Sequence, residues 1–188
     1  MASWNLGPLT ASQSLPESCA ADLESVHKIR TTPEGYYWLQ HGPLSSSCFP
    51  SGYSALTAQY YSPARCPYGY TPACGTTNAI GTVTETIQTC CPTQYEYKCQ
   101  TDPTYEWEST LGCSDGVTEG ASTTWIVEDI TGGFAETTTS PGLQGGLNAF
   151  SIQVRWQSDD FATTTASTNV RGPSFSLDLQ DMVTCSAS

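Results

Sequence analysis

The chain has 188 residues and a formal net charge of −12, because six Lys and Arg face 18 Asp and Glu. A protein this acidic is repelled by phosphate backbones and anionic lipid surfaces, which argues against a nucleic-acid partner. The length suffices for a real hydrophobic core, so size alone does not require cross-linking, yet nine cysteines are present. This cysteine content indicates an oxidising compartment.

The first ten residues, MASWNLGPLT, contain no basic segment followed by an apolar run, so no signal peptide is visible. No apolar run approaches the roughly 18 residues of a membrane-spanning helix. We therefore expect a secreted or cell-surface protein whose leader has been removed. We expect no membrane span in this chain, and a natural anchor beyond Ser188 stays open.

The predicted elements are mainly short strands, because apolar and polar residues alternate with a period of two. A helix of two turns is predicted only in residues 19–29. The predicted strands, in chain order, cover residues 25–30, 35–40, 81–90, 94–99, 122–130, 149–157 and 174–183.

Residues 149–157 alternate most clearly. Phe150, Ile152, Val154 and Trp156 face one side of this predicted strand, and Ser151, Gln153 and Arg155 face the other. Gly and Pro mark turns or irregular loops in CFPSGY, SPARCPYGYTPAC, TTSPGLQGG and VRGPS. Short strands between turns predict an all-β fold with few short helices, which we interpret as an antiparallel, sandwich-like ectodomain stapled by disulfides. We divide it into a cysteine-rich region, 1–114, and a C-terminal β region, 115–188, with a single interleaved domain as the alternative.

Eight cysteines lie in the first 113 residues, and Cys185 lies almost at the end of the chain. The spacings contain no Cys-x-x-Cys pair of the kind that binds zinc or carries redox chemistry. We therefore expect disulfides, and no metal or cofactor. Cys90 and Cys91 are adjacent and cannot easily bond to each other, so we expect them to bond to different partners. Eight cysteines allow 105 pairings, which the sequence does not resolve. The cysteines expected in disulfides are Cys19, Cys48, Cys66, Cys74, Cys90, Cys91, Cys99 and Cys113.

Catalytic motifs are scarce, and we expect a protein that is not an enzyme. Only His27 and His41 could serve as an imidazole base, and we interpret them as a solvated-face residue and a loop residue. Glu106 and Glu108 flank Trp107 and form the best local pair of carboxylates for glycoside hydrolysis. With 18 acidic residues such neighbours arise by chance, so a carbohydrate-active enzyme is only an alternative. No spaced calcium loop surrounds Asp159 or Asp115.

Aromatic residues crowd the cysteine-rich half, where they could bind a glycan or a protein as rigid anchors, or could fill a small core. The candidate binding residues are Tyr36, Tyr37, Trp38, Tyr105 and Trp107. Tyr95 and Tyr97 face the same side of a predicted strand as Cys99, so we expect them in the core.

Several blocks of the sequence match a pattern of known proteins in order and spacing. These blocks are CFPSGY at 48–53, YSPARCPYGYTPAC at 61–74, TCCP at 89–92 and IQVRWQ at 152–157. The chain resembles a group of filamentous-fungal secreted or surface cysteine-rich proteins that have no settled activity. The resemblance implies an extracellular fungal domain for adhesion, wall contact or recognition. A secreted effector-like protein that binds a host or competitor protein is the alternative.

Overall fold

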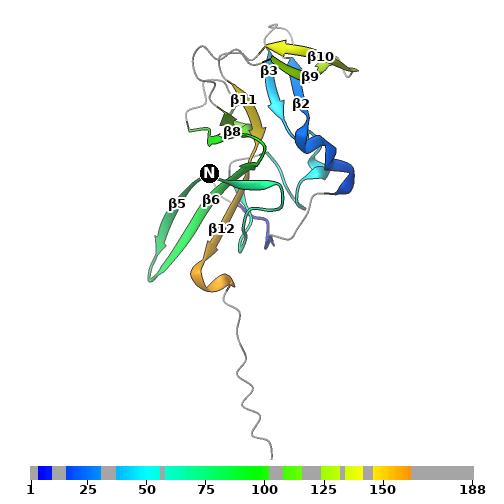
Figure 1. Ribbon diagram of the computed structural model, residues 1–188. Helices are drawn as coiled ribbons and strands as arrows, with labels where there is room; N and C mark the ends of the chain where they lie inside the picture. The colour runs from blue at the N-terminus through cyan, green and yellow to red at the C-terminus, as the bar shows by residue number, and fades with distance from the viewer. Residues whose placement is uncertain are drawn as a thin grey trace, which may run out of the picture.

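A computed structural model describes residues 4–9, 16–30, 37–55, 58–101, 108–115, 124–131, 134–141 and 146–161 (Figure 1). Twelve strands, one short α-helix and four 3-10 turns occur in this part of the chain. The strands are β1 Trp4–Asn5, β2 Val26–Arg30, β3 Tyr37–His41, β4 Gln59–Tyr60, β5 Tyr70–Ile80, β6 Val83–Pro92, β7 Lys98–Cys99, β8 Gly112–Asp115, β9 Thr124–Thr131, β10 Phe134–Pro141, β11 Leu147–Phe150 and β12 Ile152–Gln157. The helical segments are η1 Glu17–Cys19, η2 Ala21–Glu24, η3 Ser46–Cys48, α1 Glu108–Leu111 and η4 Ser158–Phe161.

The strands form a seven-stranded sheet, ordered β10-β9-β2-β3-β11-β8-β7, a three-stranded sheet, ordered β12-β6-β5, and the pair β1-β4. The predicted all-β, sandwich-like class is confirmed. The three-stranded sheet is antiparallel as predicted, whereas the seven-stranded sheet is mixed, because β2 pairs with β9 and β3 with β11 in parallel, and the pair β1-β4 is also parallel. The large sheet takes strands from both sides of residue 114, since β9 and β11 lie beside β2 and β3.

The strand predicted at 149–157 divides in two at Ser151. β11 belongs to the seven-stranded sheet, and β12 continues into the three-stranded sheet (Figure 1). At the division Gly112 has a φ of +78°, and a Cβ at this position would overlap the Ser151 side chain. Glycine at 112 therefore allows β8 to approach the point where the chain changes sheets.

Two hydrophobic clusters fill the interior. The first surrounds Ile152 and Val154, which have no exposed surface, and it includes Leu9, Leu23, Phe49, Tyr61 and Tyr70. The second lies on one face of the large sheet and includes Val26, Leu39, Tyr97, Val127 and Leu147. The predicted inward face of 150–156 is confirmed, because Phe150 and Trp156 pack against the first cluster.

The strand predicted at 94–99 is wrong in extent, since only Lys98–Cys99 forms a strand there. Residues 93–97 instead form a turn, in which Tyr97 N–H donates to the Tyr95 carbonyl at 3.0 Å. The prediction that Tyr95 and Tyr97 lie in the core is nevertheless confirmed, because Tyr97 is buried and Tyr95 is half-buried against the second cluster.

Two further predictions differ from the structure, and one falls on residues that the structure does not describe. The helix predicted at 19–29 appears only as 3-10 turns before β2 begins at Val26, and α1 was not predicted. The segment at 66–74, interpreted as turns, contains the first part of the long strand β5. The predicted strand at 174–183 and Cys185 lie outside the described residues.

Candidate functional site

The β5–β6 hairpin extends away from the body of the protein (Figure 1). Near its base the register shifts between Pro72 and Cys74, and from there the ladder runs regularly from Cys74↔Thr89 to Ile80↔Val83. We call residues 74–89 the hairpin arm. Every residue from Cys74 to Thr84 is exposed, on both faces of the ladder. An extended segment with so little burial contributes little to the core, so a structural role alone does not explain its length.

The sequence of the arm favours this hairpin. Thr, Val and Ile are enriched in strands because their branched side chains suit an extended backbone. A two-residue loop, Gly81-Thr82, joins Ile80 to Val83, and Gly81 has a φ of +62°, which favours glycine. Pro72 is tolerated because β5 is an edge strand, where a missing N–H does not break the ladder.

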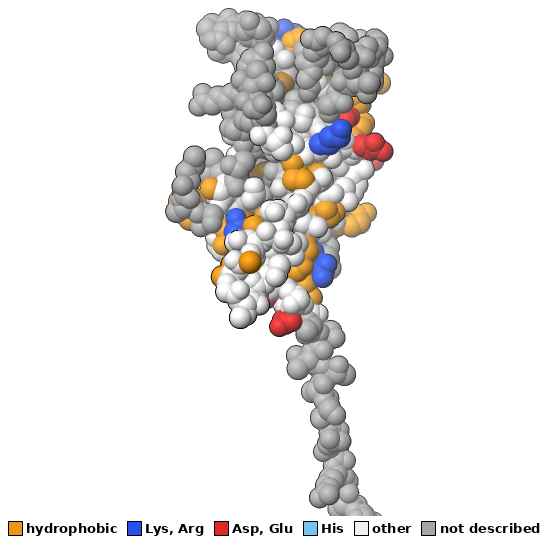
Figure 2. All heavy atoms as spheres, turned by 90° about the vertical axis from the view of Figure 1, so that its left-hand side faces the viewer, with side chains coloured by type: hydrophobic (Ala, Val, Ile, Leu, Met, Phe, Trp, Pro, Cys, Tyr) orange, Lys and Arg blue, Asp and Glu red, His pale blue; other side chains and the backbone are white. Residues whose placement is uncertain are grey.

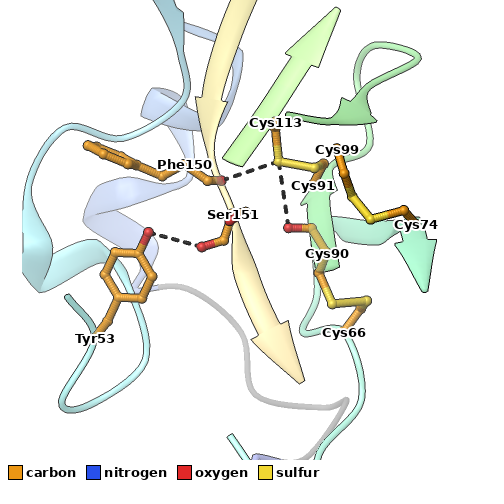
Figure 3. The surroundings of a disulfide bond; sticks show 9 residues. All are labelled: Tyr53, Cys66, Cys74, Cys90, Cys91, Cys99, Cys113, Phe150 and Ser151. Atoms are coloured by element: carbon orange, nitrogen blue, oxygen red, sulfur yellow. Dashed lines mark hydrogen bonds between the residues drawn. A yellow bond between two sulfur atoms is a disulfide. The ribbon is translucent and has the colours of Figure 1, made fainter. Parts of the chain in front are cut away.

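Disulfides anchor the base of the arm (Figure 3). Cys74, the first residue of the arm, bonds to Cys99 on β7. Cys90 and Cys91 follow the last residue of the arm and bond to Cys66 and Cys113, respectively. The prediction that these adjacent cysteines bond to different partners is confirmed. Three covalent links therefore fix where the arm leaves the body.

The fourth disulfide joins Cys19 to Cys48 in the first cluster, so all eight cysteines of the first 113 residues are paired. Cys185 thus has no partner among them. The Cys113 sulfur also lies 3.8 Å from the Cys90 carbonyl oxygen and 3.9 Å from that of Phe150 (Figure 3). These are packing contacts, because a disulfide sulfur carries no proton to donate.

The arm is uncharged over most of its length. No charged residue occurs from 66 to 84, although the chain carries a net charge of −12. The first charge on β6, Glu85, lies 3.7 Å from Arg155 on β12, whose guanidinium lies 3.7 Å from the centre of the Tyr60 ring. Among the described residues on this side of the molecule, Figure 2 shows mostly uncharged surface with few acidic or basic side chains. A partner can therefore approach the arm without crossing a dense layer of carboxylates.

The tip of the arm is apolar. Ile80 and Val83 lie directly opposite each other and are 53% and 39% exposed. Two adjacent aliphatic side chains in water at the end of a projecting hairpin have hydrophobic free energy to gain from a partner. Ile126 on β9 is 75% exposed, but it lies on a different sheet.

Of the five aromatic residues predicted to bind a ligand, the structure describes Tyr37 and Trp38, and these two do not share one surface. Tyr37 and Trp38 are consecutive in β3, so their side chains point to opposite faces of the sheet. Tyr37 receives the Lys28 ammonium 4.3 Å from its ring centre, and Trp38 donates from Nε1 to Gln40 Oε1 at 3.3 Å. Tyr36, Tyr105 and Trp107 lie outside the described residues, as does Glu106; Glu108 begins α1, but its side chain is not described.

The predictions for both histidines are wrong, because neither is on a solvated face or in a loop. His27 in β2 is buried, with Nδ1 3.2 Å from Glu128 Oε2. His41 ends β3 and is 1% exposed, and burial lowers its pKa to about 4. Their burial could not be predicted from the sequence, because both residues adjoin polar or turn-forming neighbours.

The His27 side chain belongs to a polar row that crosses the large sheet in register. Glu128, His27, Gln40 and Asn148 occupy neighbouring positions on four successive strands. His27, Gln40 and Asn148 are buried. Nδ1 of His27 faces the Glu128 carboxylate, and Nε2 of His27 and Nε2 of Gln40 are buried without a hydrogen-bond partner, so this row offers no solvent-accessible catalytic base.

The described residues also line a small, partly open pocket beside β12. Its lining is Leu6, Tyr53, Ser54, Ala55, Gln59, Tyr61, Thr110, Ser151 and Gln153. It contains no carboxylate, imidazole or amine, and burial raises the pKa of Tyr61 to about 12. The lining therefore offers no acid or base that ionises near neutral pH. Within the described ranges, no three His, Cys, Asp or Glu side chains cluster as metal ligands would.

The fold and the arm together define a disulfide-bonded all-β protein with a projecting hairpin that is uncharged from Cys74 to Thr84. No family model, no curated protein and no solved structure matches the chain. Among the residues that can be placed, no helix has the length and apolar character needed to cross a bilayer. Four disulfides fit a protein that matures in an oxidising compartment.

Proposed function

We propose that this protein is a non-enzymatic extracellular recognition domain, secreted or displayed at a fungal cell surface, that contacts a protein ligand through the hairpin arm. The observation that carries the proposal is the arm itself. From Cys74 to Thr84 it is exposed on both faces and uncharged within an acidic chain, its tip is apolar, and its base is fixed by three disulfides. The resemblance to fungal secreted and surface proteins supports the location.

A fixed base favours binding because ordering a loop on association costs free energy. The disulfide from Cys74 to Cys99 and the bonds of Cys90 and Cys91 hold both strands of the arm where they enter it. A partner then loses less affinity to ordering of the arm than it would with a free hairpin. A rigid contact of this kind suits adhesion or recognition.

The chemistry of the arm favours protein over glycan. Sugar rings are commonly recognised by stacking on aromatic side chains, and the arm from Cys74 to Thr89 contains none. It offers instead aliphatic side chains at Ile80 and Val83, hydroxyls and amides between them, and a free backbone edge on β5. These groups match the surface and backbone of another polypeptide.

Retention on fungal cell walls tests the proposal. Fluorescently labelled protein is incubated with intact walls of a filamentous fungus, with protease-treated walls and with a glycan array. Three forms are compared: the natural chain, the double variant Ile80→Ser/Val83→Ser, and the control Ile126→Ser, which removes an exposed aliphatic side chain from another sheet.

We expect the natural chain and the Ile126 control to be retained alike, retention by the tip variant to fall at least about tenfold, and protease treatment of the walls to abolish binding. The proposal is wrong if the natural chain is not retained, if all three forms are retained equally, or if only glycans retain it.

A further inference from the structure

We propose that the outer edge of β5 pairs with β5 of a second copy of this chain, antiparallel, about a two-fold axis that passes through Thr77. This inference rests on the proposed function, because it names the protein that the arm contacts. It follows from the backbone groups left free on the edge, from their symmetry, and from the absence of charge along the strand.

The free backbone groups follow from the hydrogen bonds of the neighbouring strands. Arg155 N–H donates to the Tyr61 carbonyl at 2.9 Å, so Arg155 directs its backbone groups away from β6. Adjacent residues in a strand direct these groups to opposite sides. Val154 and Trp156 therefore bond to Gln88 and Thr86 on β6, which leaves Ile87 and Thr89 to bond to β5.

The same alternation on β5 identifies its outward residues. Thr76 and Cys74 pair with Ile87 and Thr89, so their N–H and C=O groups point inward. Gly75, Thr77 and Ala79 must then direct their backbone groups outward. These residues are exposed, and among the strands that the structure describes none lies beyond β5 in the sheet.

The outward residues are symmetric about Thr77. In a two-fold antiparallel pair centred there, Thr77 faces Thr77 of the second copy, and Gly75 faces Ala79 in both directions. Each of these pairs exchanges two N–H···O bonds, so every outward group is satisfied. A register moved toward the base would use the irregular position Ala73, and one moved toward the tip would use the turn residue Gly81.

Charge also favours a second copy. Two molecules with a net charge of −12 repel each other over most approaches, but this edge brings together only uncharged side chains. The Thr77 pair places like hydroxyl side chains together, a favourable cross-strand combination. The same register lays each exposed Ile80 beside Cys74 of the other copy, which removes part of the apolar tip from water.

The outer edge of β5 also lacks, over residues 74–80, the features that usually prevent one sheet edge from pairing with another. Lys residues, prolines and bulges normally interrupt exposed edges. On β5 the proline and the irregular register occur at Pro72 and Ala73, before the arm begins, and residues 74–80 contain none of them. The contact is shorter than a standard interface, so we expect a dissociation constant on the order of 100 μM.

Cross-linking tests the register. The change Thr77→Cys, made with Cys185→Ser to leave no other unpaired cysteine, places two thiols across the proposed axis. Residues that exchange both hydrogen bonds have Cα atoms about 5.5 Å apart, within the range of a disulfide. The control Ala79→Cys lies on the same face of the same strand, but the Cα atoms of the two copies of residue 79 would be about 14 Å apart. We expect mild oxidation to give a covalent dimer with Thr77→Cys and at least tenfold less with Ala79→Cys; equal yields, or none with Thr77→Cys, would overturn the proposal.

Sedimentation equilibrium, up to concentrations on the order of 1 mM, tests the association itself. We expect the natural chain to dimerise, Thr77→Lys to remain monomeric because two ammonium groups meet at the axis, and Thr84→Lys on the inner strand to dimerise like the natural chain. A natural chain that stays monomeric overturns this inference, and loss of wall retention by the tip variant would still support the proposed function. If the natural chain dimerises as expected but wall retention does not depend on the arm, the inferred dimer is supported and the proposed function is wrong.

Discussion

Acidification should destabilise the protein through His41. This side chain is 1% exposed and lies between two tyrosines, with ring centres 4.8 Å from Tyr95 and 5.9 Å from Tyr97. Burial is the main cause that lowers its pKa from 6.5 to about 4, and the nearby His27 adds to it. In the unfolded chain the imidazole binds a proton at the ordinary pKa, whereas in the folded protein it stays neutral until about pH 4.

Because the unfolded state binds more protons between these two values, the free energy of unfolding should fall as the pH drops from about 6.5 to about 4 and then level off with respect to this group. The shift corresponds to a loss of about 3 kcal/mol over this window. Burial and the nearby Glu96 raise the pKa of Asp115, which acts in the opposite direction, so a matched variant is required.

Urea denaturation at a series of pH values under non-reducing conditions measures the effect, with His41→Phe as the comparison. Phe keeps an aromatic ring in the same space but cannot titrate. Whatever its stability at pH 7.5, the free energy of unfolding of the variant should fall by about 3 kcal/mol less on acidification than that of the natural chain. Parallel curves for the two proteins would refute the reasoning, because they would show that His41 is protonated equally in the folded and unfolded states.

Two other predictions concern the fold. Gly112→Ala should lower the free energy of unfolding, measured with heat or urea, by about 3 kcal/mol, because the residue has positive φ and the new methyl group overlaps Ser151. The control Gly81→Ala also has positive φ but has open space around the new methyl group, so it should lower the free energy of unfolding by about 1 kcal/mol. Equal losses would contradict the close packing of Gly112 against Ser151. Replacing Cys74 and Cys99 by Ala should lower stability by about 3 kcal/mol and speed amide exchange along the arm, and unchanged exchange in the arm would show that this disulfide does not order it.

Local alternation predicted the inward face of the last described strand, because Ile152 and Val154 are flanked by polar residues that reach the other face. It did not predict that the chain changes sheets at Ser151. That change depends on the contact with Gly112, which is distant in sequence. Nor could the alternation reveal the pairing of the cysteines, since many pairings satisfy the same spacing.

The candidate site was missed for a different reason. Gly69 and Pro72 made the start of β5 look like a loop, although an edge strand tolerates proline. A signal was nevertheless present in the sequence: Ile80-Gly81-Thr82-Val83 is a short turn between β-branched residues, and no charge occurs from 66 to 84. The abundance of aromatic residues instead predicted a binding patch that includes Tyr37 and Trp38, whose side chains the strand places on opposite faces.

Disulfide bonds fix the base of the arm, and their pairing in the naturally produced protein tests this anchoring most directly. Digestion at acidic pH prevents exchange, and partial reduction followed by stepwise alkylation separates the bonds of Cys90 and Cys91. We predict that mass spectrometry will find Cys66 with Cys90, Cys74 with Cys99, Cys91 with Cys113 and Cys19 with Cys48. Reduced thiols at these positions, or a map in which Cys74 is not joined to Cys99, would contradict the anchored arm.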